Sequence, residues 1–116
     1  MRLRDIVEAL VLEVVTGAEK LDAEVNRGYA SDLMSDVLAN SQRGDVWITL
    51  QIHLNIVAVA SMKQLAGIII INNRRPEDET AQRAEKENLP ILLSKLPAFE
   101  LIGRLYQLGV SGISDA

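Results

Sequence analysis

Three apolar runs of this chain are each followed directly by a short polar cluster. The runs occupy residues 46–50, 68–71 and 91–93. If they are parallel strands, the clusters meet at the carboxyl ends of one sheet, the edge where open α/β folds bind ligands. The pattern predicts a candidate ligand site and does not by itself identify the ligand. The site would be formed by Thr49, Gln51, His53, Asn55, Asn72, Asn73, Arg74 and Ser94.

The second cluster carries the clearest anion signal. Arg74 and Arg75 follow two asparagines and precede a helix start at Pro76. Guanidinium groups and helix N-termini both favour phosphate-like groups. The alternative is that both arginines pair with the acids at 77–79 in a solvated loop.

His53 is the only histidine, and a general base needs a partner that orients its ring. The sequence offers no such partner nearby, so a loop or capping role is favoured over ligand contact, and ligand contact over catalysis. Asp32 and Asp36 lie four residues apart and could reach one cation from a helix face. Such pairs are usually solvated first turns, and no third ligand is evident, so no metal site is predicted.

Motifs for catalysis are absent from the sequence. It contains no P-loop, no Gly-x-Ser-x-Gly elbow and no Gly-x-Gly-x-x-Gly fingerprint. The chain has no cysteine, which excludes thiolate nucleophiles, disulfides and cysteine-type zinc sites. We therefore predict no catalytic residues and no cofactor, although a nucleotide or phosphate compound could be the ligand.

Composition indicates how the elements are built. Of 116 residues, 48% are hydrophobic but only 3% aromatic, so Ile, Leu, Val and Ala must form the core, as suits strands covered by helices on both faces. The length predicts one domain over residues 1–116. A net charge of −4 and the lack of a basic block argue against nucleic acid as a partner. No apolar stretch approaches the ~20 residues of a membrane span, and acids interrupt the N-terminal apolar pattern, so we expect a cytoplasmic protein.

Periodicity and punctuation predict the order of the elements. Residues 46–55 alternate as one long strand would, but Asn55 is a competent N-cap, which favours a strand to Leu50 followed by a buried helix. The last helix should present Phe99, Ile102, Leu105 and Tyr106 on one side. The complete prediction is helix 3–10, strand 12–15, brief strand 23–25, a helix capped by Ser31 and closed by Asn40, strand 46–50, helix 55–65, strand 68–71, helix 76–88, strand 91–93, helix 97–108 and a frayed tail 111–116.

Three stretches of the chain resemble the DRTGG domain family. They are residues 27–40 (RGYASDLMSDVLAN), 45–51 (DVWITLQ) and 53–61 (HLNIVAVAS), and the resemblance extends over nearly the whole chain. Domains of this family occur alone, between regulatory CBS domains of some inorganic pyrophosphatases, and within some phosphotransacetylases. They are also similar to the N-terminal domain of HPr kinase/phosphorylase. The resemblance implies a single-domain, three-layer α/β sandwich with a mainly parallel sheet.

The sequence departs from the family pattern after the run 68–71. Asn72 and Asn73 stand where the resemblance implies a small, glycine-containing segment, and the string Asp-Arg-Thr-Gly-Gly is absent. Glycine has no Cβ, so it lets a ligand approach the backbone more closely than any other residue does. Asparagine can still adopt a positive φ and brings its own donors, so this loop is expected to bind polar groups through its side chains.

Three functions fit these observations. The first is a regulatory module that binds a small anion or nucleotide and acts on a partner enzyme. The second is an interaction or dimerisation subunit to which Tyr29, Trp47, Met34 and Met62 contribute surface. The third is a small enzyme for phosphorylated metabolites, in which His53 or an aspartate would be essential. We favour a combination of the first two, a homodimeric regulatory or accessory module, because symmetric dimers are the commonest assembly.

Overall fold

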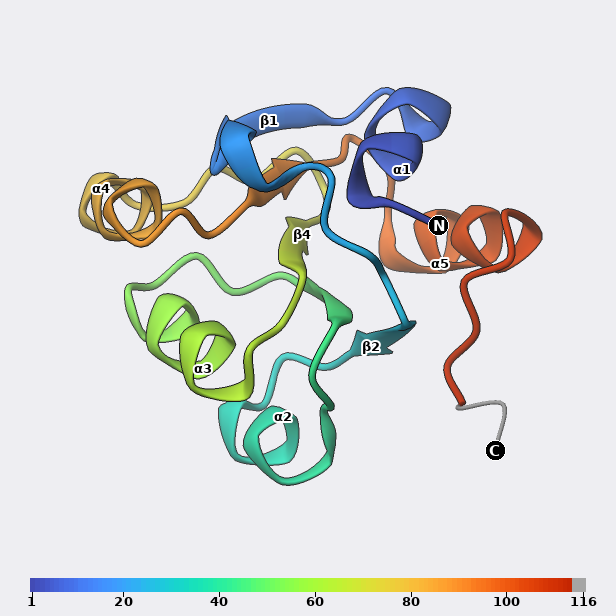
Figure 1. Cartoon of the computed structure of the whole chain (residues 1–116). Coiled ribbons are helices and arrows are strands. Elements are labelled where there is room, and N and C mark those ends of the chain that lie inside the picture. The colour runs from blue at the N-terminus through green and yellow to red at the C-terminus, as the bar shows by residue number, and fades with distance from the viewer. Residues whose placement is uncertain (114–116) are drawn as a thin grey trace.

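One five-stranded sheet organises the protein, seen here as a computed structural model that describes residues 1–113 (Figure 1). The strand order is β1-β5-β4-β3-β2. The last four strands in sequence are parallel to one another, and β1 alone runs antiparallel, beside β5. The strands are β1 (Glu13–Thr16), β2 (Arg27–Ala30), β3 (Asp45–Thr49), β4 (Gly67–Ile70) and β5 (Ile91–Leu93).

Helices cover both faces of the sheet. Helices α1 and α5 lie on one face, and α2, α3 and α4 lie on the other (Figure 1). This confirms the three-layer α/β sandwich with a mainly parallel sheet that the resemblance implies. The helices are α1 (Leu3–Leu10), α2 (Met34–Asn40), α3 (Asn55–Lys63), α4 (Asp78–Lys86) and α5 (Ala98–Gln107), with a short 3-10 helix η1 (Ala18–Lys20).

Strand β4 lies at the centre of the sheet and supplies both cores. Ile69 and Ile71, the residue directly after the strand, pack on the α1/α5 side, while Ile68 and Ile70 pack on the side of α2, α3 and α4. Alternate strand residues point to opposite faces, so a strand buried on both sides needs an unbroken apolar run. The run 68–71 has that character for this reason.

A long crossing connects β1 with β2, because these two strands lie at opposite edges of the sheet. Residues 17–26 run along the amino ends of the parallel strands, in front of the sheet in Figure 1. Leu21 and Val25 anchor the crossing in the α1/α5 core. At its start, Gly17 has φ +71°, and a Cβ there would collide with the backbone nitrogen of Pro90, so only glycine fits.

The brief strand predicted at 23–25 is wrong. This segment belongs to the crossing and makes one isolated bridge, between Glu24 and Arg2. The edge strand β2 follows at Arg27–Ala30. It was not recognised because its arginine and glycine are not among the β-branched and aromatic residues that usually indicate a strand. The Arg27 Nε donates 2.8 Å to the fully buried Asp45 Oδ1, which ties the start of β2 to β3.

Helix α2 also differs from its predicted start. It begins at Met34, whereas the sequence places Ser31 at the cap. Ser31 Oγ accepts from the Leu33 N–H, which forms a short turn ahead of the helix. Asp32 lies outside the helix, and its carboxylate accepts from the Thr49 hydroxyl of β3. Helix α3 starts at Asn55 as predicted and ends two residues early, at Lys63, although Asn55 is its first residue and not its N-cap.

The predicted apolar face of α5 is only partly correct. Leu101 and Leu105 enter the core, while Phe99 and Tyr106 are 92% and 69% exposed and Ile102 lies at the boundary. The helix carries two apolar stripes, and the sheet covers only one of them. Of the tail, Ser111 accepts through its backbone oxygen from the Gly28 N–H, and residues 114–116 lie outside the described part of the chain.

Two of the four residues assigned to a partner surface are also placed differently. Trp47 is fully buried on β3, and Met34 packs against the core formed with α2, α3 and α4. Tyr29 is half-buried and donates to Asp36, whereas Met62 is 71% exposed on α3.

Candidate functional site

The loops after β3, β4 and β5 meet at the carboxyl edge of the sheet and are hydrogen-bonded to one another. Arg74 Nη1 donates 2.8 Å to the Leu50 backbone oxygen, which joins the β3 and β4 loops. The backbone N–H groups of Asn73 and Asn72 donate to the carbonyls of Ser94 and Leu96, which joins the β4 and β5 loops. The three loops that carry the polar clusters are thus joined at one edge of the sheet.

Thr49 and Gln51 are held by Asp32, a residue that the sequence analysis assigned to a helix turn. Asp32 Oδ1 accepts from the Thr49 hydroxyl at 2.8 Å and from the Leu50 N–H at 2.7 Å. The Gln51 side chain donates 2.9 Å to the Asp32 backbone oxygen, and Thr49 is only 1% exposed. Both residues therefore close the loop rather than face a ligand. Had residues 27–30 been recognised as a strand, Asp32 would have appeared at its carboxyl end beside the other clusters.

His53 has a structural partner at the start of α3. Its Nδ1 accepts 3.1 Å from the backbone N–H of Asn55, one of the donors that a helix leaves free at its N-terminus. The ring is exposed, and within residues 1–113 no carboxylate is hydrogen-bonded to it. This is the capping role that the sequence analysis favoured, and the oriented partner of a general base is missing from the described residues.

Asn72, Asn73 and Arg74 form an exposed group that we call the β4 tip. Asn72 and Asn73 have φ values of +57° and +56°, the left-handed conformation that asparagine tolerates. In the described part of the chain their side-chain amides make no hydrogen bond, and the Arg74 guanidinium pairs with no carboxylate. The β4 tip therefore presents amide and guanidinium donors to solvent.

Two neighbours of the β4 tip are already engaged. Arg75 forms a double hydrogen bond with Glu13 of β1, at 2.7 and 3.1 Å, and not with the acids at 77–79. This contact holds the pKa of Glu13 below its ordinary value. Ser94 is buried, and its hydroxyl oxygen accepts from the Leu96 N–H. Of the two arginines, only Arg74 keeps its charge free of a carboxylate.

Asp32 and Asp36 do not share a site. Asp36 accepts from the Tyr29 hydroxyl and from the Asn40 amide, at 2.8 and 2.9 Å. Hydrogen bonds from Ser31, Tyr29 and Asn40, in that order, hold its pKa below the ordinary value for aspartate. No group of three or more His, Cys, Asp or Glu residues within 1–113 is arranged to hold a metal ion.

The cavities described are not lined by the candidate residues of the carboxyl edge. The largest of those described, about 890 Å³, opens at the amino edge beside the crossing. A second, of about 660 Å³, lies between α4 and Leu54, and a third, of about 290 Å³, separates β2 from α5. In the part of the chain that is described, no helix has the length and apolar character needed to cross a membrane.

A comparison with solved structures identifies the fold. The chain is similar to a crystal structure of the CBS and DRTGG domains of the regulatory region of Clostridium perfringens pyrophosphatase, complexed with the activator diadenosine tetraphosphate. The TM-score is 0.73 at 16% sequence identity, and the match covers 98% of this chain but 51% of that one, so the chain spans about half its length. No protein-family model matches the chain, and the search of curated proteins gave no match. The likeness supports a DRTGG-like fold.

Proposed function

We propose that this DRTGG-like domain is a non-catalytic regulatory or accessory module that binds a small phosphate-bearing anion at the β4 tip. The fold likeness to the regulatory region of an enzyme supports the regulatory part of the proposal. By analogy, the module would act on a partner enzyme in the cytoplasm.

The main observation behind this proposal is which hydrogen-bond donors at the carboxyl edge remain available to a ligand. Arg74 presents the planar donor fork that matches phosphate oxygens, and it has no competing carboxylate within residues 1–113. Asn72 and Asn73 add two amide groups beside it, each with two N–H donors. The side chains of Thr49, Gln51, His53 and Ser94 hold the loops in place, and Asn55 contributes its backbone N–H to His53.

The same contacts argue against an enzyme. His53 uses its Nδ1 on the Asn55 backbone, and the Thr49 hydroxyl is buried against Asp32. A nucleophile or base engaged in this way would have to break a loop contact before it reacted. We therefore favour ligand binding over catalysis for this edge.

Titration calorimetry with inorganic pyrophosphate tests the proposal. Arg74→Ala should weaken binding about tenfold, the effect expected for one charge-assisted hydrogen bond. Arg75→Ala removes the same charge one residue away but breaks only the contact with Glu13, so it is the matched control. Thermal melting of both variants checks that the loop contact of Arg74 with Leu50 is not needed for folding. Equal losses in both variants would contradict a specific site.

We also propose that the module is a homodimer. The outer stripe of α5 leaves Phe99 and Tyr106 exposed, with Ile102 between them. This stripe borders the 290 Å³ cavity, which is lined mainly by apolar groups of β2, β3 and α5. Exposed apolar residues gathered in one place favour an interaction surface, whereas isolated ones do not.

A further inference from the structure

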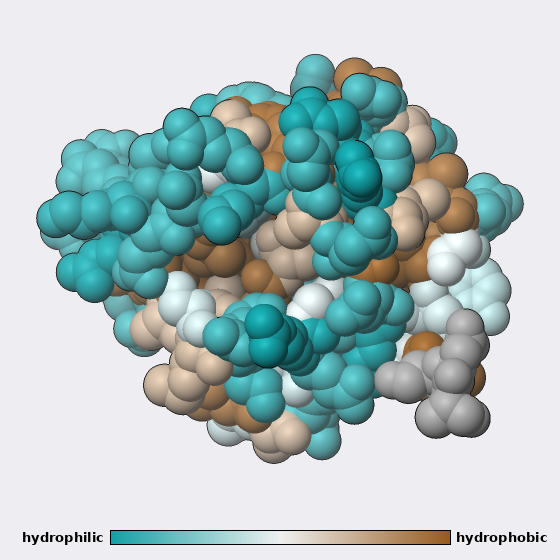
Figure 2. All heavy atoms as spheres, in the orientation of Figure 1, coloured by the Kyte–Doolittle hydropathy of each residue, from teal (hydrophilic) through white to brown (hydrophobic). Residues whose placement is uncertain are grey.

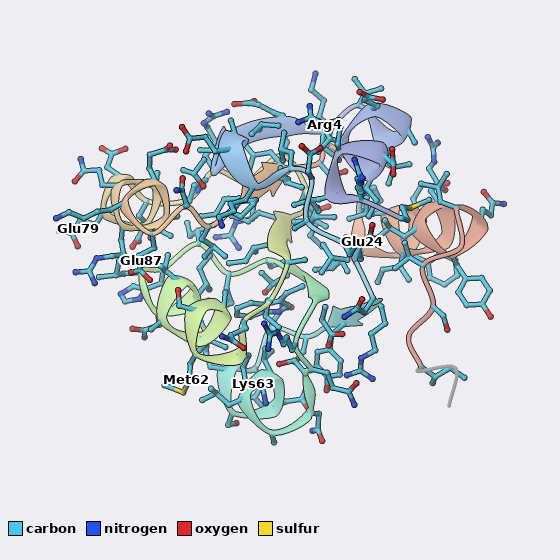
Figure 3. The ribbon with its side chains drawn as sticks, in the orientation of Figure 1. Arg4, Glu24, Met62, Lys63, Glu79 and Glu87 are labelled. Atoms are coloured by element: carbon cyan, nitrogen blue, oxygen red, sulfur yellow. The ribbon has the colours of Figure 1, made fainter. Side chains whose placement is uncertain are left out.

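The amino-edge groove is the largest cavity described in this molecule, and neither the β4 tip nor the α5 stripe accounts for it. It lies between the crossing on one side and the carboxyl ends of α3 and α4 on the other. Figure 2 looks onto this edge and shows a central hollow with an apolar floor and a hydrophilic rim. Glu24 and Glu87, labelled in Figure 3, lie on opposite sides of it. Its volume of about 890 Å³ falls within the range of small-molecule sites, roughly 300–1,000 Å³.

The groove follows from the topology and is preformed. Because β1 and β2 lie at opposite edges, the crossing must pass the amino ends of all the strands between them. The backbone closes the walls: Asn26 N–H donates to the Gly44 oxygen, and Gly44 N–H donates to the Gln64 oxygen. A ligand would therefore enter a shaped space without having to order these loops first.

The floor of the groove is apolar. Leu65, Ala66, Leu89 and Pro90 line it and are themselves buried. Ala23 of the crossing, which is half-buried, also lines the groove. Small and branched apolar groups of this kind accommodate a flat or aliphatic body and provide no donors of their own.

The acidic and the basic side chains at the rim differ in whether they already have a partner. Glu24 pairs with the N-terminal amine at 3.2 Å, and Glu87 accepts from Ser61 and pairs with Arg83. The cations Lys20 and Arg43 also line the groove, yet none of the ion pairs within residues 1–113 includes either of them. The charge left for a ligand is therefore positive.

We infer that the amino-edge groove is a second ligand site and that it takes a nucleoside phosphate. The base would lie on the floor at Leu65 and Leu89, and the phosphate would meet Lys20 and Arg43. The amide side chains of Gln64 and Asn88, which also line the groove, match the donors and acceptors on the edge of a base. This site is separate from the β4 tip and does not depend on it.

The test is a titration of the whole chain with ATP, followed by amide NMR shifts and calorimetry. Binding in the groove should shift the amide signals of Ala23, Gly44, Gln64 and Asn88. Arg43→Ala should weaken ATP binding about tenfold. Lys63→Ala is the control, because it removes the same charge from the end of α3, outside the groove lining. This variant should change the ATP dissociation constant less than about twofold. Thermal melting of each variant confirms that it is folded.

The outcomes separate this inference from the proposed function. Loss of ATP binding in Arg43→Ala with binding kept in Arg74→Ala supports the groove. Loss in Arg74→Ala with binding kept in Arg43→Ala overturns the groove and favours the β4 tip. No shift of the groove amides at millimolar ATP overturns the inference, whatever pyrophosphate does at the β4 tip.

Discussion

Asp32 determines which polar side chains at the carboxyl edge remain available. Its carboxylate satisfies the Thr49 hydroxyl and the Leu50 N–H, and its backbone oxygen satisfies Gln51. These contacts fix the β3 loop, from which the Leu50 oxygen in turn receives Arg74. Asp32, which belongs to no recognised motif, thus supports the β4 tip indirectly, through Leu50.

Removal of this carboxylate should destabilise the protein. Asp32→Ala leaves the Thr49 hydroxyl and the Leu50 N–H without their acceptor, at a cost of about 1–3 kcal/mol in the free energy of unfolding. Urea denaturation followed by the fluorescence of the buried Trp47, which is the only tryptophan, measures the change. Asp32→Asn keeps an oxygen at Oδ1 and should lose less. An Asp32→Ala variant as stable as the wild type would contradict the supporting role.

At the scale of elements, β4 and α5 differ in how their apolar residues are used. Every residue of β4 is buried, because helices cover the sheet on both faces. Helix α5 has apolar residues around more of its circumference, yet only Leu101 and Leu105 are buried. A helix on one face of a sheet needs only one apolar stripe for packing, which leaves its second stripe for another purpose.

The central position of β4 leads to a stability prediction. Ile69 is fully buried and lies between Ile48 of β3 and Leu92 of β5 in the register. Ile69→Ala should lower the free energy of unfolding by about 2–5 kcal/mol, through lost burial and the cavity left behind. Met62→Ala, at an exposed position on α3, is the control and should cost under about 1 kcal/mol. A loss below about 1 kcal/mol at Ile69 would argue against a central, doubly covered strand.

At the scale of the whole molecule, the exposed stripe of α5 predicts assembly. The double variant Phe99→Ser and Tyr106→Ser should raise the dimer dissociation constant more than about tenfold, since buried aromatic residues dominate interface energies. Analytical ultracentrifugation over a range of concentrations measures it. Met62→Ser changes an equally exposed apolar residue elsewhere and should leave the dimer intact. A wild-type chain that is monomeric at every concentration would contradict the proposal.

Surface ion pairs between distant segments predict an acid-sensitive fold. Arg75 lowers the pKa of Glu13, and Arg4 lowers that of Asp22, so the folded state holds these carboxylates charged more strongly than the unfolded chain does. The contribution of these two ion pairs to the stability of the fold is present above the ordinary carboxyl pKa. It is lost as the pH falls through the lowered pKa values of Glu13 and Asp22. The melting temperature should therefore decrease progressively below about pH 4.5. Glu13→Gln should flatten this decrease, and an unchanged pH profile in that variant would contradict the role of the pair.

Local patterns in the sequence determined most of the elements. Helix 3–10 and strand 91–93 have the predicted bounds, because amphipathic spacing and a proline before an apolar run are local signals. The resemblance to DRTGG domains led to the same fold class that the structural comparison supports. Strand β2 was misplaced, since its residues are held by β3 and the tail rather than by an alternating pattern of their own.

Which polar groups are free was decided by the tertiary structure alone. Asp32 meets Thr49 from 17 residues away, and Glu13 meets Arg75 from 62 residues away, so no local pattern reveals that these side chains are engaged. The amino-edge groove likewise depends on the strand order, which forces residues 17–26 across the ends of the sheet. Residue types and their spacing determined the elements and the edge where the polar clusters gather. The partners of each side chain, and the cavity at the opposite edge, depend on distances that exist only once the chain is folded.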